Sequence, residues 1–225
     1  SSLSPMPTST VEDYLKHILL EEQGRGEERV PTGRLAQALA VTPGTVTAMV
    51  KALADSGLVD YEAYGGVRLT DAGRQLALHV VRRHRLIELF LVRIMGMDWS
   101  EVHADADRLE HAVSDGLIER IDEMLGRPAV DPHGDPIPTV GGDVAPVAHE
   151  ILAELAVGCR GRVARIADQE PGFLRLVERL GLRPGTRVRV VACDEDADTL
   201  EIQIGRGVGA RLGLRAAAKI LVELD

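Results

Sequence analysis

The chain has 225 residues, of which 45% are hydrophobic, 27% charged and 3% aromatic, and this hydrophobic share excludes a disordered chain. No apolar run approaches the roughly 18–20 residues that span a bilayer, and no signal peptide opens the sequence, so we expect a cytoplasmic protein with no membrane partner. The net charge of −9 argues against a nucleic-acid partner only if the acidic residues are evenly spread, because phosphate binding needs one basic face.

The first third of the chain predicts a helix–turn–helix followed by a hairpin. Residues 1–9 are polar and are expected to form a disordered tail. Apolar residues at helical spacing predict a first helix over residues 10–22, and two shorter helices flank the break at Thr42-Pro43-Gly44. Two alternating runs around Tyr64-Gly65-Gly66 predict a β-hairpin. The predicted boundaries are 32–40 and 43–56 for the two shorter helices, and 58–61 and 67–69 for the strands.

The third helix and the hairpin are the candidate contacts to DNA. Small polar side chains at a helix start let phosphates reach free backbone N–H groups, where the helix dipole favours negative charge. The hairpin would then lie as a wing along the adjacent backbone. The alternative is a helical hairpin with a β-ribbon and no ligand, but the polar helix start and glycine-rich tip together favour DNA. The candidate contacts are Thr42, Gly44, Thr45, Thr47, Lys51, Tyr64 and Arg68.

Longer helices and then strands follow. Thr70 or Asp71 is expected to cap a helix that reaches about residue 94, with two more helices over about 98–112 and 115–125. Five prolines and four glycines in residues 126–146 indicate a linker or an ordered arm. Beyond it, alternating runs around one helix indicate a small β domain. The strands are predicted at 187–192 and 199–204, and the helix at about 171–180.

The negative charge is concentrated in one block. Residues 84–140 carry 5 basic and 12 acidic side chains, a net of −7, whereas residues 1–83 carry 9 and 10 and residues 141–225 carry 12 and 13. Asp107, Glu110 and His111 stand at i, i+3 and i+4, which predicts two carboxylates and an imidazole on one helix face. His84 and Glu88 form a second pair at i, i+4. Such donors chelate divalent ions, and without an ion the carboxylates would repel one another.

The alternative interpretation is that these residues are solvated surface charges. Each residue taken alone fits that alternative, but two chelating pairs in adjacent helices of the most acidic segment favour a metal site. Asp13, on the first predicted helix with Glu12 beside it, is a further candidate that spacing alone does not decide.

Four motifs carry a resemblance to a known family, and they are Val11-Glu12-Asp13-Tyr14-Leu15, Arg83-His84-Arg85-Leu86, Leu109-Glu110-His111 and Asp131-Pro132-His133-Gly134-Asp135-Pro136-Ile137-Pro138. From about residue 8 to its end, the chain resembles the DtxR/MntR family of metal-dependent transcriptional repressors. The resemblance implies a homodimer that binds a double-stranded DNA operator, is not an enzyme and takes no small-molecule substrate.

The resemblance also implies a mainly α chain with a small β domain. A winged helix–turn–helix would occupy residues 10–73 and a helical metal-binding and dimerisation domain residues 74–140. A small Src-homology-3-like (FeoA-like) β-barrel would occupy residues 141–225. The run from Leu180 to Val188 resembles a turn of that barrel, with Gly181 ending a helix and Pro184-Gly185 forming a type II turn. Both cysteines, Cys159 and Cys193, lie in this domain, and we expect them to be small buried apolar residues and not ligands.

Two metal sites are implied by the same resemblance. The primary, regulatory site would consist of Asp13, Asp107, Glu110 and His111. An ancillary site would contain His84, Glu88 and His103 and would be completed from the C-terminal domain by Gln169 and Glu170. Some members of the family draw the arm into a second site instead, which would make Asp131 and His133 ligands. The alternative for His133 is a turn residue.

The ligand types indicate the metal. The iron-sensing branch has sulfur at the positions of Asp13 and Asp107, whereas this chain has oxygen at both, and carboxylate and imidazole suit hard Mn(II). Lys16 stands where a carboxylate completes a two-metal cluster in some manganese sensors, which argues against a paired centre. We therefore expect a Mn(II)-activated repressor of metal-uptake genes that also binds other divalent transition metals in vitro. The alternatives are a Fe(II)-responsive repressor of the same family and, from a different class, a metal-dependent hydrolase.

Overall fold

The computed structural model describes residues 8–25, 28–144, 148–205, 207 and 209–225, and the chain folds into two compact units. The first unit comprises Ser1–His84, Glu110–Val113 and Pro138–Asp143. The second comprises Arg85–Leu109, Ser114–Ile137 and Val144–Asp225. Helix α4 (Asp71–Arg93) contributes its first part to the first unit and its last part to the second. None of the helices in the described ranges is long and apolar enough to cross a membrane.

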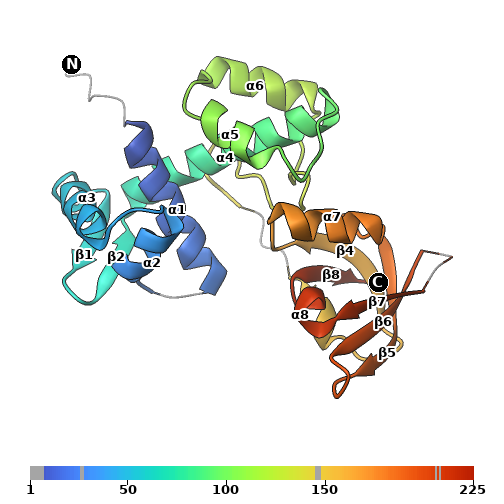
Figure 1. Ribbon diagram of the computed structural model, residues 1–225. Helices are drawn as coiled ribbons and strands as arrows, with labels where there is room; N and C mark the ends of the chain where they lie inside the picture. Colours follow the sequence, from blue (N-terminus) through green and yellow to red (C-terminus); the bar gives the residue numbers. More distant parts are fainter. Residues whose placement is uncertain (1–7, 26–27, 145–147, 206, 208) are drawn as a thin grey trace. The chain divides into compact units, whose positions relative to one another are not determined.

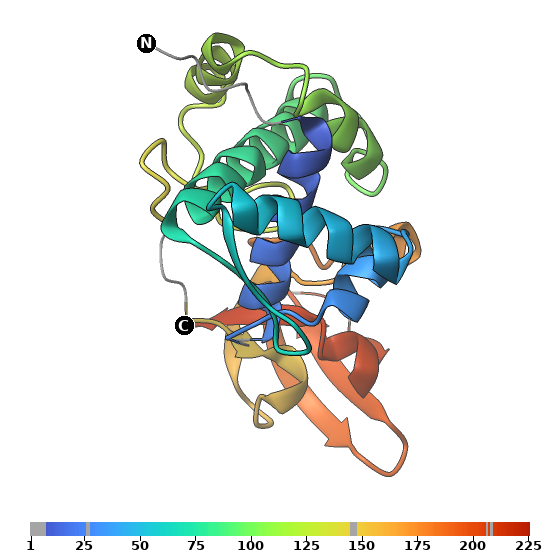
Figure 2. The same cartoon turned by 90° about the vertical axis from the view of Figure 1, so that its left-hand side faces the viewer.

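A helix–turn–helix with its hairpin makes up most of the first unit (Figures 1 and 2). Its elements are α1 (Ser9–Arg25), α2 (Thr32–Ala38), α3 (Pro43–Asp55), β1 (Val59–Glu62) and β2 (Gly66–Leu69). The apolar stripes of the three helices meet in a core that includes Leu15, Ile18, Leu19, Leu35, Val46, Val50 and Leu53. The predicted helices and hairpin are confirmed to within three residues at each end. Most of the predicted disordered tail, residues 1–7, lies outside the described residues, whereas Ser9 already belongs to α1.

Local signals fix both ends of α3. The Thr42 side chain accepts a hydrogen bond from the backbone N–H of Thr45, and Pro43 occupies the first turn, where its missing N–H is not needed. Just beyond the helix, Gly57 takes a φ of 72°, a conformation that costs least in glycine. At the tip of the hairpin, Tyr64 also has a positive φ of 66° and its side chain is fully exposed.

Two short helices of the second unit correct one predicted element. They are α5 (His103–Leu109) and α6 (Asp115–Met124). The helix predicted over 115–125 is confirmed by α6, whereas α5 is shorter than the helix predicted over 98–112. The Asp98 carboxylate accepts the backbone N–H of Ser100, a local bond that competes with helix formation. Beyond Leu109 the chain turns, so Glu110 and His111 lie outside the helix, and the prediction that one helix carries them together with Asp107 is wrong.

The proline-rich segment is an ordered arm over residues 126–137. The backbone N–H of Asp131 donates to the carbonyl of Asp135 at 2.9 Å, which closes a compact turn. Gly134 in this turn has a φ of 90°, and a Cβ built on it would lie 2.0 Å from the carbonyl oxygen of Ala164 in β4 (Arg160–Ile166). Only glycine allows the arm to approach the strand this closely.

The C-terminal part of the second unit is a sheet of six antiparallel strands in the order β3-β8-β4-β5-β6-β7. Its other elements are β3 (Glu150–Ile151), the 3-10 helix η1 (Leu152–Glu154), α7 (Pro171–Arg179), β5 (Arg187–Asp194), β6 (Thr199–Ile204), β7 (Gly209–Gly213), α8 (Leu214–Ala217) and β8 (Ile220–Leu224). The small β domain is confirmed, but the described strands form an open sheet and not a closed barrel. The edge strand β3 has only two residues, and within the described ranges it pairs with β8 alone.

The turn after α7 is confirmed, but the cysteines are not buried as predicted. Gly181 has a φ of 74° at the helix end. Gly185 has a φ of 91°, and the backbone N–H of Thr186 donates to the carbonyl of the residue before Pro184, as in a type II turn. Cys193 is exposed because the β5–β6 hairpin extends past the core after Val190, and Cys159 is half-buried in the turn before β4.

Candidate metal centre

The first candidate cluster lies in the first unit, around the imidazole of His111. Helix α1 places Glu12 and Asp13 side by side, and the turn after α5 brings His111 against them. The ring Nδ1 lies 2.6 Å from Oε2 of Glu12, and Nε2 lies 2.9 Å from Oδ1 of Asp13. Oε1 of Glu110 is 3.4 Å from the same Nε2. Three carboxylates therefore surround one imidazole.

Glu110 is the buried centre of this cluster, with no exposed side-chain surface. Nζ of Lys16, one turn after Glu12 on α1, donates to its two carboxylate oxygens at 2.9 and 2.8 Å. Nδ1 of His84 on α4 lies 2.5 Å from Oε2 of Glu110 and 3.0 Å from Nζ of Lys16. The ammonium group of Lys16 therefore lies within hydrogen-bond distance of both Glu110 and His84.

The charges around His111 favour the protonated, positively charged form of its imidazole. Burial alone would lower the pKa of His111, but the hydrogen bond to Glu12 and the charges of Asp13 and Glu110 together raise it above its ordinary value. Both ring nitrogens face carboxylate oxygens, and these contacts stabilise the protonated form of the imidazole.

Asp13, Glu110 and His111 offer one oxygen or nitrogen each within 4.8 Å of one another, so these three residues form a candidate ligand set. Asp107, which was also predicted to join them, lies on α5 in the second unit and stays a prediction. Sequence reasoning noted Glu12 only as a neighbour of Asp13. Its contact with Nδ1 of His111 is typical of the outer partner that orients a ligating imidazole.

The second candidate cluster lies within the second unit, where Glu88, Asp131 and His133 offer ligand atoms within 4.8 Å of one another. All three side chains are buried, each with 1% of its surface exposed. Nδ1 of His133 lies 3.8 Å from Oε2 of Glu88 and 4.0 Å from Oδ1 of Asp131. These separations are too long for hydrogen bonds and leave room for an ion between the donors.

The tautomer of His133 is set by the other side of its ring. Nε2 lies 3.0 Å from the carbonyl oxygen of Trp99, an acceptor only, so this nitrogen carries the hydrogen and donates. In the neutral ring, Nδ1 then presents a lone pair, and this buried atom has no hydrogen-bond partner among the described residues. The indole ring of Trp99 stacks on the imidazole with centroids 5.4 Å apart and further fixes its orientation. A ligating histidine is commonly held in this way.

Asp131 has one hydrogen-bonded oxygen, and its second oxygen lies 4.0 Å from Nε of Arg85. Its Oδ1 accepts the backbone N–H groups of His133 and Asp135 at 2.8 and 2.9 Å, whereas buried Oδ2 has no hydrogen-bond partner among the described residues. Burial, together with the charges of Asp135 and Glu88, holds the pKa of Asp131 well above its ordinary value, and Arg85 offsets this only in part. A divalent cation would relieve this repulsion.

Other predicted ancillary ligands lie close by in the second unit. Nδ1 of His103 is 3.0 Å from Oε1 of Glu88, and its Nε2 is 3.6 Å from Oδ2 of Asp107. Gln169 instead donates from Nε2 to Oδ2 of Asp135 at 2.8 Å, and Glu170 is the exposed N-cap residue of α7. Glu170 does not belong to a candidate set of His, Cys, Asp and Glu ligands among the described residues.

The predicted DNA contacts lie at the start of α3 and on the hairpin, which face the viewer in Figure 2. The side chains of Thr42, Thr45 and Lys51 are exposed, and Gly44 leaves the backbone open. Thr47 is half-buried, and its hydroxyl donates to the carbonyl of Pro43 at 2.9 Å. The exposed ring of Tyr64 marks the tip of the hairpin. Arg68, which stays a predicted DNA contact, pairs with Asp60 of β1 at 2.9 Å.

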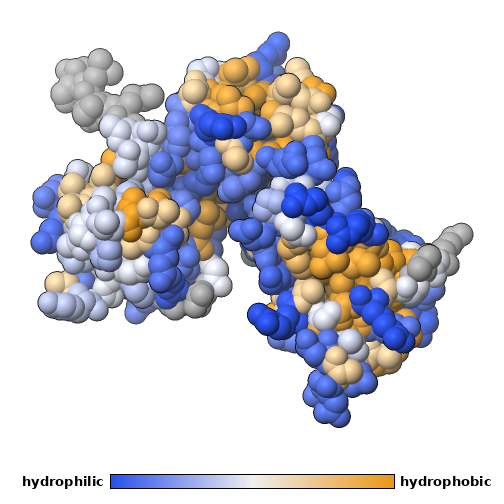
Figure 3. Space-filling model, in the orientation of Figure 1, coloured by the Kyte–Doolittle hydropathy of each residue, from blue (hydrophilic) through white to orange (hydrophobic). Residues whose placement is uncertain are grey.

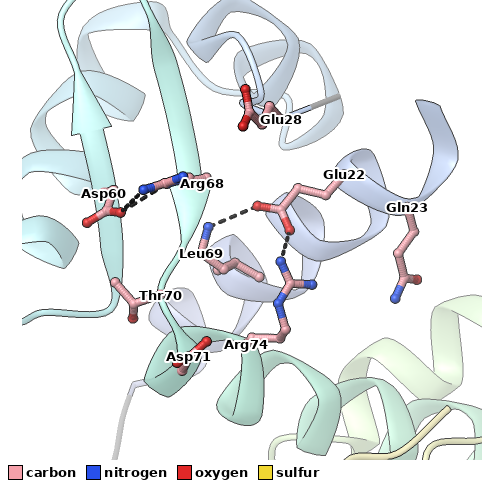
Figure 4. Close-up of a pocket in the computed structure, with 9 residues that line it drawn as sticks. All are labelled: Glu22, Gln23, Glu28, Asp60, Arg68, Leu69, Thr70, Asp71 and Arg74. Carbon is pink, nitrogen blue, oxygen red and sulfur yellow. Dashed lines mark hydrogen bonds and ion pairs between the residues drawn. The ribbon is translucent and has the colours of Figure 1, made fainter. Parts of the chain in front are cut away.

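A network around Glu22 connects α1 with the hairpin (Figure 4). Glu22 accepts the backbone N–H of Leu69 in β2 at 2.9 Å through Oε1 and an Arg74 N–H of α4 at 2.6 Å through Oε2. Its side chain is only 9% exposed and borders a cavity of about 710 Å³. Helix α1 therefore carries Asp13 near its start and, through Glu22 near its end, holds the hairpin. The sequence did not predict this interaction, because no local pattern marks it.

Three family models match consecutive parts of the chain. "Iron dependent repressor, N-terminal DNA binding domain" matches residues 6–67, and "Iron dependent repressor, metal binding and dimerisation domain" matches residues 70–139. "FeoA domain" matches residues 151–224.

Relatives of similar length carry related descriptions. The iron-dependent repressor IdeR of Mycobacterium bovis is 35% identical over 196 residues, which cover 80% of this chain and 83% of the relative. The HTH-type transcriptional regulator MntR of Lysinibacillus sphaericus is 38% identical over 120 residues, or 53% of this chain and 84% of the relative. The solved structure of a manganese-dependent transcriptional repressor in complex with manganese matches with a TM-score of 0.86 and 43% identity, covering 94% of this chain and 98% of that chain.

Proposed function

Because the chain belongs to the DtxR/MntR family of metal-dependent, DNA-binding transcriptional repressors, we propose that it is a Mn(II)-activated repressor of metal-uptake genes. The family is one of transcriptional repressors and not of enzymes, so the hydrolase alternative is wrong. Divalent metal binding, a DNA-binding domain and a dimerisation domain come with the family. For this chain, we propose which metal binds, which residues are its ligands and which residues contact the operator.

The primary site is proposed to consist of Asp13, Glu110 and His111, with Glu12 orienting the imidazole. Two carboxylates and one imidazole already converge there, and their mutual contacts are those of a cluster that holds a cation. A bound ion would tie α1 to the turn after α5 within the first unit. Asp107 stays a predicted further ligand of this site. Lys16 occupies the position beside Glu110, so we propose one ion here and not two.

The second site is proposed to consist of Glu88, Asp131 and His133, with His103 beside it. The observation that carries this assignment is the buried Nδ1 of His133, whose Nε2–H is fixed on the Trp99 carbonyl while Nδ1 itself has no hydrogen-bond partner among the described residues. This arrangement favours the version of the ancillary site that draws in the arm. His84, Gln169 and Glu170 remain predicted ligands.

Manganese is favoured by the chemistry of the donors. The residues proposed for both sites provide only carboxylate oxygens and imidazole nitrogens, which suit Mn(II), whereas thiolate and thioether ligands favour softer ions. The solved relative described as a complex with manganese supports the same choice. Fe(II) is the alternative, because the IdeR relatives are described as iron-dependent. Zn(II) is expected to bind more tightly than Mn(II) in vitro, since intrinsic affinity follows the Irving–Williams order.

The DNA and dimer surfaces are proposed from exposed side chains. The start of α3, with Thr42, Gly44 and Thr45, and the hairpin tip at Tyr64 would contact the operator. Apolar residues gather over α6 in Figure 3, where the Leu117 and Met124 side chains are 51% and 64% exposed. An exposed apolar surface of this kind is typical of a protein interface, and we propose that it contacts a second copy of the chain in the dimer.

The domain limits of 10–73, 74–140 and 141–225 remain our proposal. They are supported by the family models that match residues 6–67, 70–139 and 151–224.

Electron paramagnetic resonance of Mn(II) added to the purified protein tests the two sites separately. Free Mn(II) gives a strong signal that is lost on binding, so a titration counts bound ions. We expect two ions per chain in the wild type, and one each in His111→Ala and His133→Ala. The matched control His79→Ala, on α4 and outside the candidate ligand sets of the described residues, should keep two ions. A count of two in both His111→Ala and His133→Ala would overturn the ligand assignment.

A further inference from the structure

Four arginines cover one face of the C-terminal sheet, namely Arg160 and Arg162 of β4 and Arg187 and Arg189 of β5, here called the arginine face. Residues alternate along both strands, so Val163, Val188 and Val190 point into the core while the arginines point outward. All four arginines are exposed.

The strand register places these four cations directly beside one another. Arg160 is paired with Arg189 and Arg162 with Arg187 across the antiparallel strands. Side chains in such pairs have Cβ atoms about 4.5–5.5 Å apart, and like charges there destabilise a sheet. The fold itself therefore does not explain the arrangement.

Neighbouring acidic groups do not neutralise the arginine face. On β8, Glu223 is the register partner of Arg162 on its other side. Within the described ranges, however, none of the four arginines forms an ion pair. Two other arginines of the same sheet are paired, since Arg165 binds Asp135 at 2.6 Å and Arg211 binds Glu201 at 3.6 Å. The arginine face thus differs from the rest of the sheet surface.

A cavity of about 200 Å³ opens on the arginine face. Its lining includes Arg160, Arg187 and Arg189 together with Gln203, Gly205 and the acidic residue Asp225. Guanidinium groups around such a cavity can donate paired hydrogen bonds to phosphate oxygens. The only apolar side chain in the lining is that of Val188, which is buried.

We propose that the arginine face is a second DNA-binding surface that contacts phosphates of the duplex, in addition to α3 and the hairpin. A protein partner is less well matched, because protein interfaces are built around an apolar centre, and this face has none. Arginines two residues apart on a strand are separated by about 6.8 Å and can follow successive phosphates of one backbone. Such a contact to DNA would not depend on which metal activates the protein.

The test is the salt dependence of DNA binding by the full chain. A 40-base-pair duplex of arbitrary sequence is titrated in chelator at several salt concentrations. Neither operator-specific contacts nor bound metal then contribute to the measured DNA affinity. The variant combines Arg187→Gln with Arg189→Gln. The control combines Arg175→Gln with Arg179→Gln on α7, which removes the same charge from exposed positions of the same unit.

We expect the β5 variant to bind the duplex more weakly, with a slope of log K against log salt smaller by about 1.8, or about 0.9 for each phosphate that the variant no longer neutralises. The control should keep the wild-type slope. The thermal midpoint of neither variant should fall below that of the wild type. The control changes exposed positions, and the β5 variant removes repulsion between like charges. Equal slopes in variant and control would overturn the proposal. A changed oligomeric state without a change in DNA binding would also overturn it and would assign the face to a protein partner.

Discussion

Replacing Lys16 by methionine tests the charge balance of the first cluster. The Lys16 side chain is 6% exposed and that of Glu110 has no exposed surface, so the variant leaves a buried carboxylate without its ammonium partner. Methionine keeps the length and the apolar packing of the chain. Removing one partner of a buried pair costs about 3–5 kcal/mol, because the remaining charge is desolvated without compensation. At about 2–4 °C per kcal/mol for a chain of this size, the thermal midpoint should fall by about 6–20 °C in chelator.

A divalent ion should return most of this stability. If Glu110 is a ligand, Mn(II) supplies the positive charge that Lys16 provided, and the ammonium group no longer competes for the carboxylate oxygens. Lys16→Met should therefore gain more thermal stability from Mn(II) than the wild type and should bind Mn(II) more tightly. The assay is thermal unfolding followed by circular dichroism, with and without Mn(II). Lys51→Met, at an exposed position of α3, is the control and should change neither midpoint.

Two results would refute the reasoning. An unchanged midpoint of Lys16→Met in chelator would show that the pair contributes no stability. If the thermal midpoint of Lys16→Met falls by the same amount in chelator and in Mn(II), then Mn(II) does not replace the Lys16 ammonium as the partner of Glu110.

Three further predictions concern other parts of the chain. Gly134→Ala should destabilise the protein by about 2 kcal/mol or more in denaturant unfolding, because the methyl group meets a backbone carbonyl at a positive φ, whereas Gly116→Ala in α6 should not. Glu22→Gln should reduce stability by about 1.5–3 kcal/mol and weaken operator binding with metal present, because the amide has no charge and only one acceptor oxygen for the two donors, Leu69 N–H and Arg74; wild-type affinity would contradict this role. Burial, reinforced by an arginine, lowers the pKa of His149 below its ordinary 6.5, so the unfolded chain takes up the proton first and stability falls as pH drops below about 6.5. His149→Gln should flatten that part of the pH–stability curve, and a curve identical to the wild type would exclude the effect.

Features fixed by neighbouring residues were predictable from the sequence. The residues that begin and end α3, namely Thr42, Pro43 and Gly57, act through local backbone geometry, and the helix lies within one residue of the predicted 43–56. The turn at Pro184-Gly185 follows from the same local rules. Alternation of apolar and polar residues likewise predicted the strands that carry the C-terminal core.

Features that depend on distant contacts were not predictable in the same way. Helical spacing suggested that Asp107, Glu110 and His111 share a helix, but Glu110 is drawn into a buried contact with Lys16, which is 94 residues away in sequence. The role of the Trp99 carbonyl in fixing His133 leaves no trace in the local sequence, since any residue supplies a carbonyl. Exposure of Cys193 depends on how far the β5–β6 hairpin extends past the core, which residue type does not reveal.

The central claim, that Mn(II) bound at Asp13, Glu110 and His111 switches DNA binding, is tested most directly by operator affinity in Mn(II) and in chelator. The assay compares the wild type with His111→Ala, and an operator fragment is first selected from genomic DNA with the Mn(II)-loaded protein. We expect Mn(II) to raise the affinity of the wild type by about tenfold or more, a coupling of about 1.4 kcal/mol, and to leave His111→Ala at the level seen in chelator. Equal wild-type affinity in Mn(II) and chelator, or a full Mn(II) response in His111→Ala, would contradict the account.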